Sequence, residues 1–487
     1  MRVMLALCPV WHTKTPPLGI AYLSAFLRAR GHQVRTLDLN IDLYRKTRDK
    51  YGDKCRDKSG DKTIDSAGPA DWWDFTIPEA ERISRLNHEE FCSDGFLDSE
   101  INGWVRRIAE FNPDVLGLSA YAESREFSLE LAQRVKAEAP KVRIVFGGPL
   151  CRASISDSEW FAHERQLDAM VIGEGELTCQ ALLEMWEKGR GGELPGAITR
   201  TNGKIAAGGL RDPLPDLDIN LPFPDYCDFP LEEYTKRNMI LIQGSRGCVG
   251  SCGFCHDRVA GKRYRCRSPG NIFTEMLLRI GQGYDSFEFC DLVLNADVKR
   301  LEKLCELIID KNLGIHWGGP IRCSPGMTLG VFKKMSMAGA GRVNIGMESG
   351  CQKMLDSMRK GFRIRDMEQN LRDMHDAGID SSVNILIGYP GETNETVAET
   401  MGFIRRNRRH IKHVSSLTPM YLMPGTYAAE HTADYGISPG GDLNSWSCEQ
   451  NTHKWRIEQC MKVYNLINRL GIGHECSQFR KDIKSLG

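Results

Sequence analysis

The chain has 487 residues, 41% of them hydrophobic and 26% charged, which is typical of a globular protein with two to four domains. Its 64 Lys and Arg balance its 64 Asp and Glu, so no net charge attracts nucleic acid. The apolar run Met4–Val10 is far shorter than the ~20 residues that span a bilayer and has no signal-peptide cleavage site. We therefore expect a cytoplasmic protein whose 17 Cys are thiols or metal ligands rather than disulfides.

Residues 1–190 alternate short apolar runs with helical patterns, which predicts a Rossmann-like α/β domain with a parallel sheet. Residues 45–99 are polar and charged, and we interpret them as an insertion with short helices on the rim. The expected strands are 2–8, 32–39, 114–119, 142–146 and 169–172, and the expected helices are 19–30, 100–111, 126–137 and one after residue 176.

Four loops follow the expected strands of this first domain, at residues 9–18, 121–125, 147–151 and 173–176. Ligands of open α/β sheets bind outside the carboxyl ends of the strands, so these loops form the predicted binding edge. Their glycines allow the backbone to approach a flat ligand closely.

A linker is expected at residues 191–237, because the stretch is rich in proline and turn residues. It contains a predicted hairpin in which residues 197–199 pair with 204–206 around Asn202-Gly203.

A second domain is expected at residues 238–430, where six strand–helix units in a row predict a parallel partial barrel. A mainly helical C-terminal cap is expected at 431–487. The expected strands are 239–243, 286–290, 315–317, 342–347, 382–387 and 415–421, and the helices are 269–280, 298–311, 329–337, 364–375 and 395–406.

Three cysteines, Cys248, Cys252 and Cys255, follow the first expected strand of the second domain in a C-x3-C-x2-C spacing. Random placement of the cysteines would give this spacing about 0.02 times per chain. Three thiolates can hold three irons of a 4Fe–4S cluster and leave the fourth iron open. The alternative is a zinc site with His256 or Cys266 as its fourth ligand, although a second C-x2-C pair is missing.

The three cysteines, with the aromatic Phe254 just before the last of them, resemble the signature of the radical S-adenosylmethionine (SAM) superfamily. The resemblance implies that these cysteines are the catalytic and metal-binding residues. It also implies that SAM binds the open iron of the cluster and is cleaved to a 5′-deoxyadenosyl radical.

The same resemblance implies SAM contacts at the ends of later strands. Glu348 and Ser349 in the run Gly346–Gly350 would bind the amino acid or ribose part of SAM. The backbone near Ile387 and Gly388 would contact adenine, with a Pro-Gly turn capped by Glu392 as the structural alternative. Asp291, Asn295 and Arg322 follow two further strands, and Arg322 would neutralise the SAM carboxylate or form a surface ion pair.

The first domain resembles the cobalamin-binding domain that precedes the radical SAM domain in one large subfamily. The matching runs are PPLGIAYL at 16–23, the strand end GLS at 117–119, GGP at 147–149 and VIGEGE at 171–176. The D-x-H-x-x-G motif is absent, so we expect no protein His on cobalt and interpret His12 as a surface loop residue. The cofactor-binding residues that this resemblance implies are Ser119, Tyr121, Gly147, Gly148, Pro149, Gly173, Glu174, Gly175 and Glu176. The alternative is a packing module without a cofactor.

Together these resemblances imply a radical SAM enzyme that uses a 4Fe–4S cluster, SAM and cobalamin to C-methylate a small molecule at an unactivated carbon. One alternative is a radical cyclase or rearrangement enzyme, similar to the anaerobic magnesium-protoporphyrin monomethyl ester cyclases. Others are a tRNA methylthiotransferase, which the neutral charge and the missing second Cys trio disfavour, and a non-catalytic zinc- or cobalamin-binding protein. Flavodoxin or ferredoxin is the implied electron donor, and membrane insertion and nucleic-acid binding are not expected. Neither the substrate nor a general acid or base, such as Tyr421 or Glu392, can be chosen from the sequence.

Overall fold

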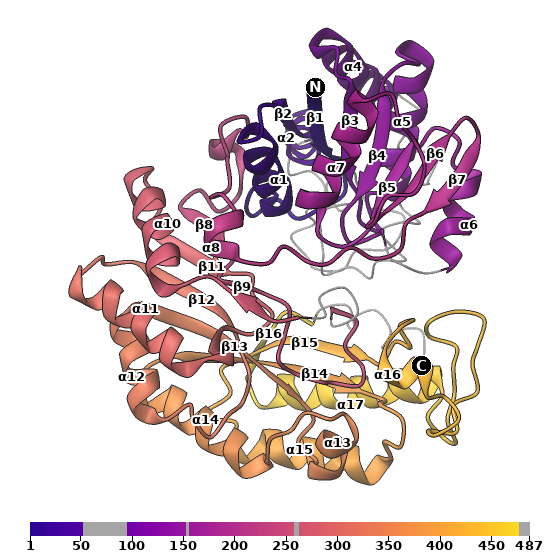
Figure 1. The fold of residues 1–487 in the computed structure, drawn as a ribbon. Coiled ribbons are helices and arrows are strands. Elements are labelled where there is room, and N and C mark those ends of the chain that lie inside the picture. Colours follow the sequence, from indigo (N-terminus) through magenta and orange to yellow (C-terminus); the bar gives the residue numbers. More distant parts are fainter. Residues whose placement is uncertain (52–94, 152–154, 258–262, 477–487) are drawn as a thin grey trace. The chain divides into compact units, whose positions relative to one another are not determined.

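The computed structural model describes residues 1–51, 95–151, 155–257 and 263–476. The chain divides into two compact units, Met1–Arg237 and Asn238–Gly487 (Figure 1). Within the described residues, no helix has both the length and the apolar character that crossing a membrane requires. Most of the rim insertion expected at 45–99 lies outside the described residues, and its first residues continue helix α2 (Leu39–Tyr51).

The first unit is built on a seven-stranded mixed sheet in the order β2-β1-β3-β4-β5-β6-β7. The first five strands are parallel, as the alternation of apolar runs and helices predicts, and β6 and β7 are antiparallel. The strands are β1 (Arg2–Leu7), β2 (Gln33–Asp38), β3 (Val115–Ser119), β4 (Arg143–Gly147), β5 (Ala169–Val171), β6 (Ala197–Thr201) and β7 (Lys204–Ala207).

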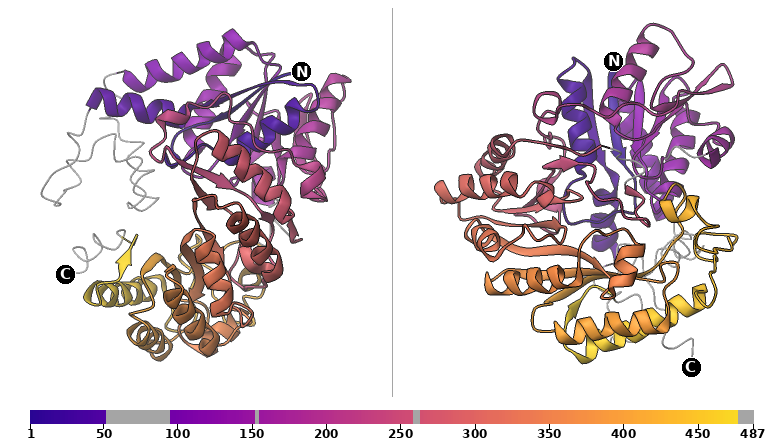
Figure 2. Two further views of the ribbon diagram at one scale, coloured as in Figure 1. Left: turned by 90° about the vertical axis from the view of Figure 1, so that its left-hand side faces the viewer. Right: turned by 60° about the horizontal axis from the view of Figure 1, so that its bottom comes forward.

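Helices cover both faces of this first sheet (Figures 1 and 2). One face carries α1 (Leu18–Arg28) and α7 (Gly175–Glu187), which pack on each other. The other buries an apolar cluster formed with α2, α4 (Phe96–Phe111), α5 (Arg125–Glu138) and α6 (Ile155–His163). Because both faces are buried, the central strands are almost continuously apolar.

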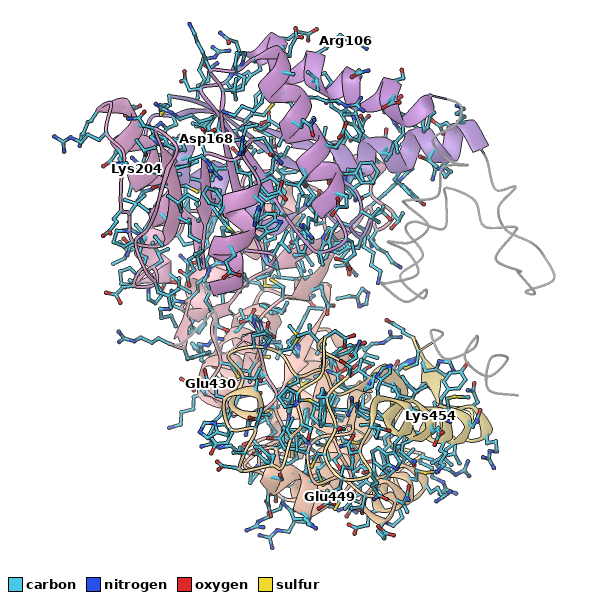
Figure 3. All side chains as sticks on the ribbon, turned by 90° about the vertical axis from the view of Figure 1, so that its right-hand side faces the viewer. Arg106, Asp168, Lys204, Glu430, Glu449 and Lys454 are labelled. Atoms are coloured by element: carbon cyan, nitrogen blue, oxygen red, sulfur yellow. The ribbon has the colours of Figure 1, made fainter. Side chains whose placement is uncertain are left out.

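The stretch expected to be a linker is part of the first unit. Its hairpin extends the sheet, because β6 pairs antiparallel with β5. Asn202 and Gly203 adopt φ angles of 49° and 76°, as the two central residues of a tight hairpin turn require. Lys204 is exposed beside this turn (Figure 3). Further along, Tyr234 donates a 2.6 Å hydrogen bond to the buried Asp38, which fastens the end of this stretch to β2.

The second unit is built on a seven-stranded parallel sheet in the order β16-β15-β14-β13-β12-β11-β8. Six of its strands are those that the sequence predicts, within a few residues. They are β8 (Met239–Ile242), β11 (Ser286–Phe289), β12 (His316–Ile321), β13 (Ala340–Glu348), β14 (Asp380–Ile387) and β15 (His413–Pro419).

The main helices of the second unit follow its strands and line one side of the curved sheet (Figures 1 and 2). They are α10 (Pro269–Gly281), α11 (Val298–Asp310), α12 (Leu329–Met337), α14 (Ile364–Asp376), α15 (Asn394–Arg406) and α17 (His453–Arg469). Shorter elements lie between them: β9 (Ser245–Arg246), β10 (Arg265–Cys266), η6 (Leu294–Ala296), α13 (Gln352–Ser357) and α16 (Tyr427–Glu430). In the first unit, α8 (Leu217–Asn220) and η5 (Leu231–Glu233) complete the description.

The expectation of a mainly helical C-terminal cap is only partly right. Residues 431–452 are irregular, with isolated bridges such as Ser438 to Ser447, and α17 follows them. Beyond α17, β16 (Gly473–His474) pairs parallel with β15 and becomes the seventh strand. Two residues are too few to show a strand pattern in the sequence.

Candidate active site

The three predicted cluster cysteines lie together on the loop that follows β8 and β9, at the carboxyl edge of the second sheet. Cys248, Cys252 and Cys255 are half-buried, and none of them forms a disulfide. The Gly250 N–H donates to the Cys248 sulfur over 3.3 Å, and the Arg322 Nη1 donates to the Cys252 sulfur over 3.8 Å. These thiol sulfurs stand for the thiolates that would bind a cluster.

Backbone hydrogen bonds fix the middle of this cysteine loop from two sides. The Gly253 N–H donates to the Met358 carbonyl over 2.9 Å, and the Gly253 carbonyl accepts from the Ala428 N–H over 3.0 Å. Next to it, the Phe254 ring meets the buried Tyr389 edge-on, with ring centroids 6.4 Å apart. The loop is therefore held by segments that follow β13 and β15, far from it in sequence.

These residues fit a 4Fe–4S cluster. The loop offers three reachable sulfurs, and N–H donors already point at two of them, which is the hydrogen bonding that tunes such clusters. The zinc alternative would need a fourth ligand, such as His256 or Cys266, beside the same three sulfurs.

Asp291, predicted as a SAM contact, holds the start of the cysteine loop. Its carboxylate accepts from the Gly244 N–H over 2.8 Å and from the Ser245 hydroxyl over 2.5 Å. Burial raises the pKa of Asp291 to about 6, although these two hydrogen bonds lower it. Both carboxylate oxygens are thus engaged by the protein, and a contact with SAM stays a prediction.

Asn295 and Arg322 act as a pair at the ends of β11 and β12. The Asn295 amide accepts from the Arg322 N–H and donates to the Arg322 carbonyl, both over 2.8 Å. This two-point clamp fixes the backbone from which the arginine side chain reaches the cysteine loop. In the described residues the Arg322 side chain contacts the Cys252 sulfur and no carboxylate, and its contact with the SAM carboxylate stays a prediction.

Glu348 ends β13 in a left-handed conformation, with φ of 62°. Non-glycine residues rarely adopt this conformation, and such strain gathers at functional sites. Its carboxylate lies 3.3 Å from the Lys360 Nζ, and both side chains are mostly buried. Lys360 was not among the residues predicted from the sequence. Its signal would have been a lysine flanked by glycine shortly after the Glu348 turn.

Ser349, the neighbour of Glu348, has a different environment. It is buried, its hydroxyl lies 3.0 Å from the Thr400 hydroxyl, and it accepts from the Cys351 N–H over 3.2 Å. The side chain therefore connects the end of β13 with α15. Its predicted contact with SAM is not tested by this arrangement and stays a prediction.

The turn after β14 carries the predicted adenine contact. The Gly388 N–H donates to the Glu392 carboxylate, and the Gly388 carbonyl accepts from the Asn451 amide over 2.9 Å. The Ile387 carbonyl accepts from the Met420 N–H over 2.7 Å. These contacts agree with the alternative interpretation of a Pro-Gly turn capped by Glu392. The adenine contact stays a prediction. Each of the two carbonyls already accepts one hydrogen bond, so adenine would have to use its second lone pair.

Arg456 of α17 lies directly beneath this turn and escaped the sequence analysis. It is fully buried and donates to the backbone carbonyls of Asn444, Trp446 and Asn451. Burial lowers its pKa to about 10. A side chain on Gly388 would collide with the Arg456 side chain, which explains glycine at that position.

In the first unit, loops after three strands meet at the predicted cobalamin edge. Trp11, which follows β1, stacks on Tyr121, which follows β3, with centroids 3.8 Å apart and planes at 22°. Gly148, which follows β4, has φ of 91°, and a Cβ there would lie 3.0 Å from both the Ala120 carbonyl and the Ser119 hydroxyl. The crowding against Gly148 and the exposed Pro149 beside it fit an edge on which backbone faces a flat ligand.

In the loop after β5, some groups are exposed and others already interact with the rest of the first unit. Gly173 is exposed, with φ of 77° and nothing within 4 Å of its missing Cβ, so it is open to a ligand. Glu174 accepts from the Leu214 N–H over 3.0 Å, and Glu176 is buried in the first turn of α7. Gly175 packs near Leu23 of α1. The glycines are thus better placed than the carboxylates to touch a cofactor.

His12 is half-buried beside Trp11, with ring centroids 4.9 Å apart, and is not the freely exposed loop residue that we expected. Burial lowers its pKa to about 4, and Lys14 adds to the effect. The imidazole is therefore neutral at pH 7.

Comparisons with known proteins agree with both units. The model of the radical SAM superfamily matches residues 242–404, and the model of the B12 binding domain matches residues 94–183. An uncharacterized methyltransferase of Pyrococcus horikoshii is 27% identical over 355 residues, covering 71% of this chain and 75% of the relative. The anaerobic magnesium-protoporphyrin IX monomethyl ester cyclase of Rubrivivax gelatinosus is 26% identical over 320 residues, and the match covers 61% of this chain and 55% of the cyclase.

Among solved structures, the radical SAM methyltransferase TsrM of Kitasatospora setae, bound to tryptophan and a SAM analogue, superposes with a TM-score of 0.65. The match covers 89% of this chain and 76% of TsrM at 18% identity, so it shows a shared fold. The two matched domains use a 4Fe–4S cluster with SAM, and cobalamin, which are the cofactors that the sequence implies. The chain therefore combines a B12-binding domain with a radical SAM domain, and it is a radical SAM enzyme.

Proposed function

We propose that this enzyme is a cobalamin-dependent radical SAM methyltransferase that C-methylates a small molecule. Relatives support methyl transfer, since the Pyrococcus protein and TsrM are both named methyltransferases. TsrM has also been solved with cobalamin and a 4Fe–4S cluster bound. The observation that carries the proposal is the loop of three reachable thiols at the edge of a parallel sheet, on a chain that also has a B12-binding domain.

When bound, the cluster with SAM would supply a carbon-centred radical, and cobalamin would supply the methyl group. The chain's own residues have simpler tasks. Cys248, Cys252 and Cys255 would bind three irons, and the glycine-rich edge of the first unit would hold the corrin. Glu348, a carboxylate beside Lys360, can accept hydrogen bonds from an ammonium or ribose hydroxyl group of SAM. An external donor such as flavodoxin or ferredoxin would deliver the electron.

The test is an anaerobic incubation of the reconstituted full-length protein with hydroxocobalamin, reductant and SAM, followed by mass spectrometry. We expect both 5′-deoxyadenosine and S-adenosylhomocysteine, because methylation must release the latter. Deoxyadenosine without S-adenosylhomocysteine would favour a cyclase, as in the Rubrivivax relative. Neither product, with no cluster formed, would contradict the proposal altogether.

A further inference from the structure

The Arg322 guanidinium occupies a slot next to the cysteine loop rather than open solvent. A Cβ on Gly250 would lie 2.5 Å from its Nη1, and a Cβ on Gly361 would lie 3.2 Å from its Nη2. Gly361 has φ of 69°, a conformation that disfavours other residues. Two segments distant in sequence therefore leave room for this one side chain.

The position of Arg322 is set by the protein before any ligand binds. Its backbone N–H and carbonyl are both bonded to the buried Asn295 amide, each over 2.8 Å. Its Nη1 lies 3.8 Å from the Cys252 sulfur. Within the described residues its charge meets no carboxylate, so a cysteine sulfur is the acceptor that it reaches.

A cation at this place favours the reduced form of a cluster. Reduction adds a negative charge to a group that three thiolates already surround, and hydrogen bonds to the sulfurs together with nearby charge set the potential. A guanidinium stays charged at any working pH and donates from a rigid fork. Its effect on the cluster would therefore be present whether or not SAM is bound.

We propose that Arg322 is a positioning residue of the cluster: it donates to the Cys252 thiolate and makes reduction of the 4Fe–4S cluster easier, independently of SAM. This inference rests on the proposed function, because it requires that the three cysteines hold a cluster. It differs from the role that the family resemblance implies for Arg322, which is to neutralise the SAM carboxylate.

The test is a redox titration of the full-length reconstituted protein without SAM, followed by EPR of the reduced cluster. We compare wild type, Arg322→Gln and Arg322→Lys at equal iron content. Arg365→Gln is the matched control, since Arg365 is a largely exposed arginine that pairs with Asp366. We expect Arg322→Gln to make reduction about tenfold less favourable, a shift of about 59 mV to lower potential for one electron. Arg322→Lys should shift less, and Arg365→Gln should not shift.

A wild-type potential in iron-loaded Arg322→Gln would overturn the proposal, and weaker SAM binding in that variant would assign the arginine to the SAM carboxylate instead. If Arg322→Gln takes up no cluster, Asn295→Ala decides, because it frees the arginine backbone without removing the charge. A lower potential in Asn295→Ala supports the proposal, and an unchanged one overturns it. Failure of the wild-type protein to form any cluster would instead contradict the proposed function.

Discussion

Cys255 is a single residue on which the proposed cluster site depends. It closes the three-thiol loop, and its N–H donates to the Cys252 carbonyl over 3.2 Å. We predict that Cys255→Ala abolishes SAM cleavage, because two thiolates cannot hold three irons of the cluster. The measurement is deoxyadenosine formation after anaerobic reconstitution. Cys305→Ala, a change at a buried cysteine of α11, is the control and should keep the activity. Deoxyadenosine from an iron-replete Cys255→Ala sample would contradict the assignment.

Glu392 is a second single residue with a measurable effect, because its raised pKa makes the stability of the protein depend on pH. Burial raises its pKa to about 8, although hydrogen bonds from the Gly388 and Tyr389 backbone lower it. The folded chain therefore holds this proton more tightly than the unfolded chain, whose carboxyl titrates near 4.5. The stability that the protonated form contributes is complete below that value and is lost as the pH rises toward 8.

We predict that Glu392→Gln removes this pH dependence, because the amide keeps the size and an acceptor but cannot ionise. Between pH 5 and 8 the wild type should lose up to about 1.4 kcal/mol of stability per pH unit relative to the variant. The thermal midpoints of both proteins, compared across this range, give the difference. A difference that stays constant with pH would show that Glu392 ionises as an ordinary surface carboxyl does.

At the scale of elements, the cysteine loop depends on packing that its own sequence does not encode. A side chain at Gly253 would collide with the Tyr389 hydroxyl, and only 3.4 Å would separate it from the Tyr389 Cζ. Tyr389 cannot move aside easily, since it is buried and its hydroxyl lies 3.1 Å from that of Tyr435. The turn after β14 therefore sets the space available to the cluster loop.

We predict that Gly253→Ala lowers the amount of iron–sulfur cluster bound per protein severalfold. The double variant with Gly253→Ala and Tyr389→Phe should recover part of this loss. Removing the hydroxyl leaves the new methyl group in ordinary contact with the ring. Iron content and absorbance after reconstitution are the measurements, with Tyr389→Phe alone as the control. An equal loss in Gly253→Ala and in the double variant would show that the hydroxyl is not the obstacle.

For the whole molecule, the division into two units predicts that the two cofactors load separately. Gly148→Ala places a methyl group against the Ala120 and Ser119 backbone and side chain in a strained conformation, at a cost of about 1–3 kcal/mol. We expect it to weaken cobalamin binding about tenfold or more while the iron content stays at the wild-type level. Both are measured on the same reconstituted sample.

Gly203→Ala is the matched control for this change. Gly203 has φ of 76°, close to the 91° of Gly148, but nothing lies within 4 Å of its missing Cβ. The control therefore carries similar backbone strain without the crowding at the β3 and β4 strand ends. Equal losses of cobalamin in both variants would indicate strain alone and would remove Gly148 from the binding edge.

The order of the strands and helices and the position of the cysteine loop could be predicted from the amino-acid sequence. Periodicity and turn residues act over short distances, so β8, β11 and the later strands were predicted within a few residues. The spacing of Cys248, Cys252 and Cys255 is likewise a local property, and it was sufficient to predict the cluster.

The partners of these residues could not be predicted, because they depend on how the chain folds in three dimensions. Asp291 and Ser349 form hydrogen bonds with other groups of the protein, and Lys360 forms an ion pair with Glu348. Arg322 contacts the sulfur of Cys252, which lies 70 residues away in the sequence. The pairing of the predicted hairpin with β5, which extends the first sheet, and the two-residue strand β16, which extends the second, also depend on the tertiary structure. Such contacts form between segments that are distant in the sequence. Neither segment by itself carries a local pattern that shows which residues of the other it will contact.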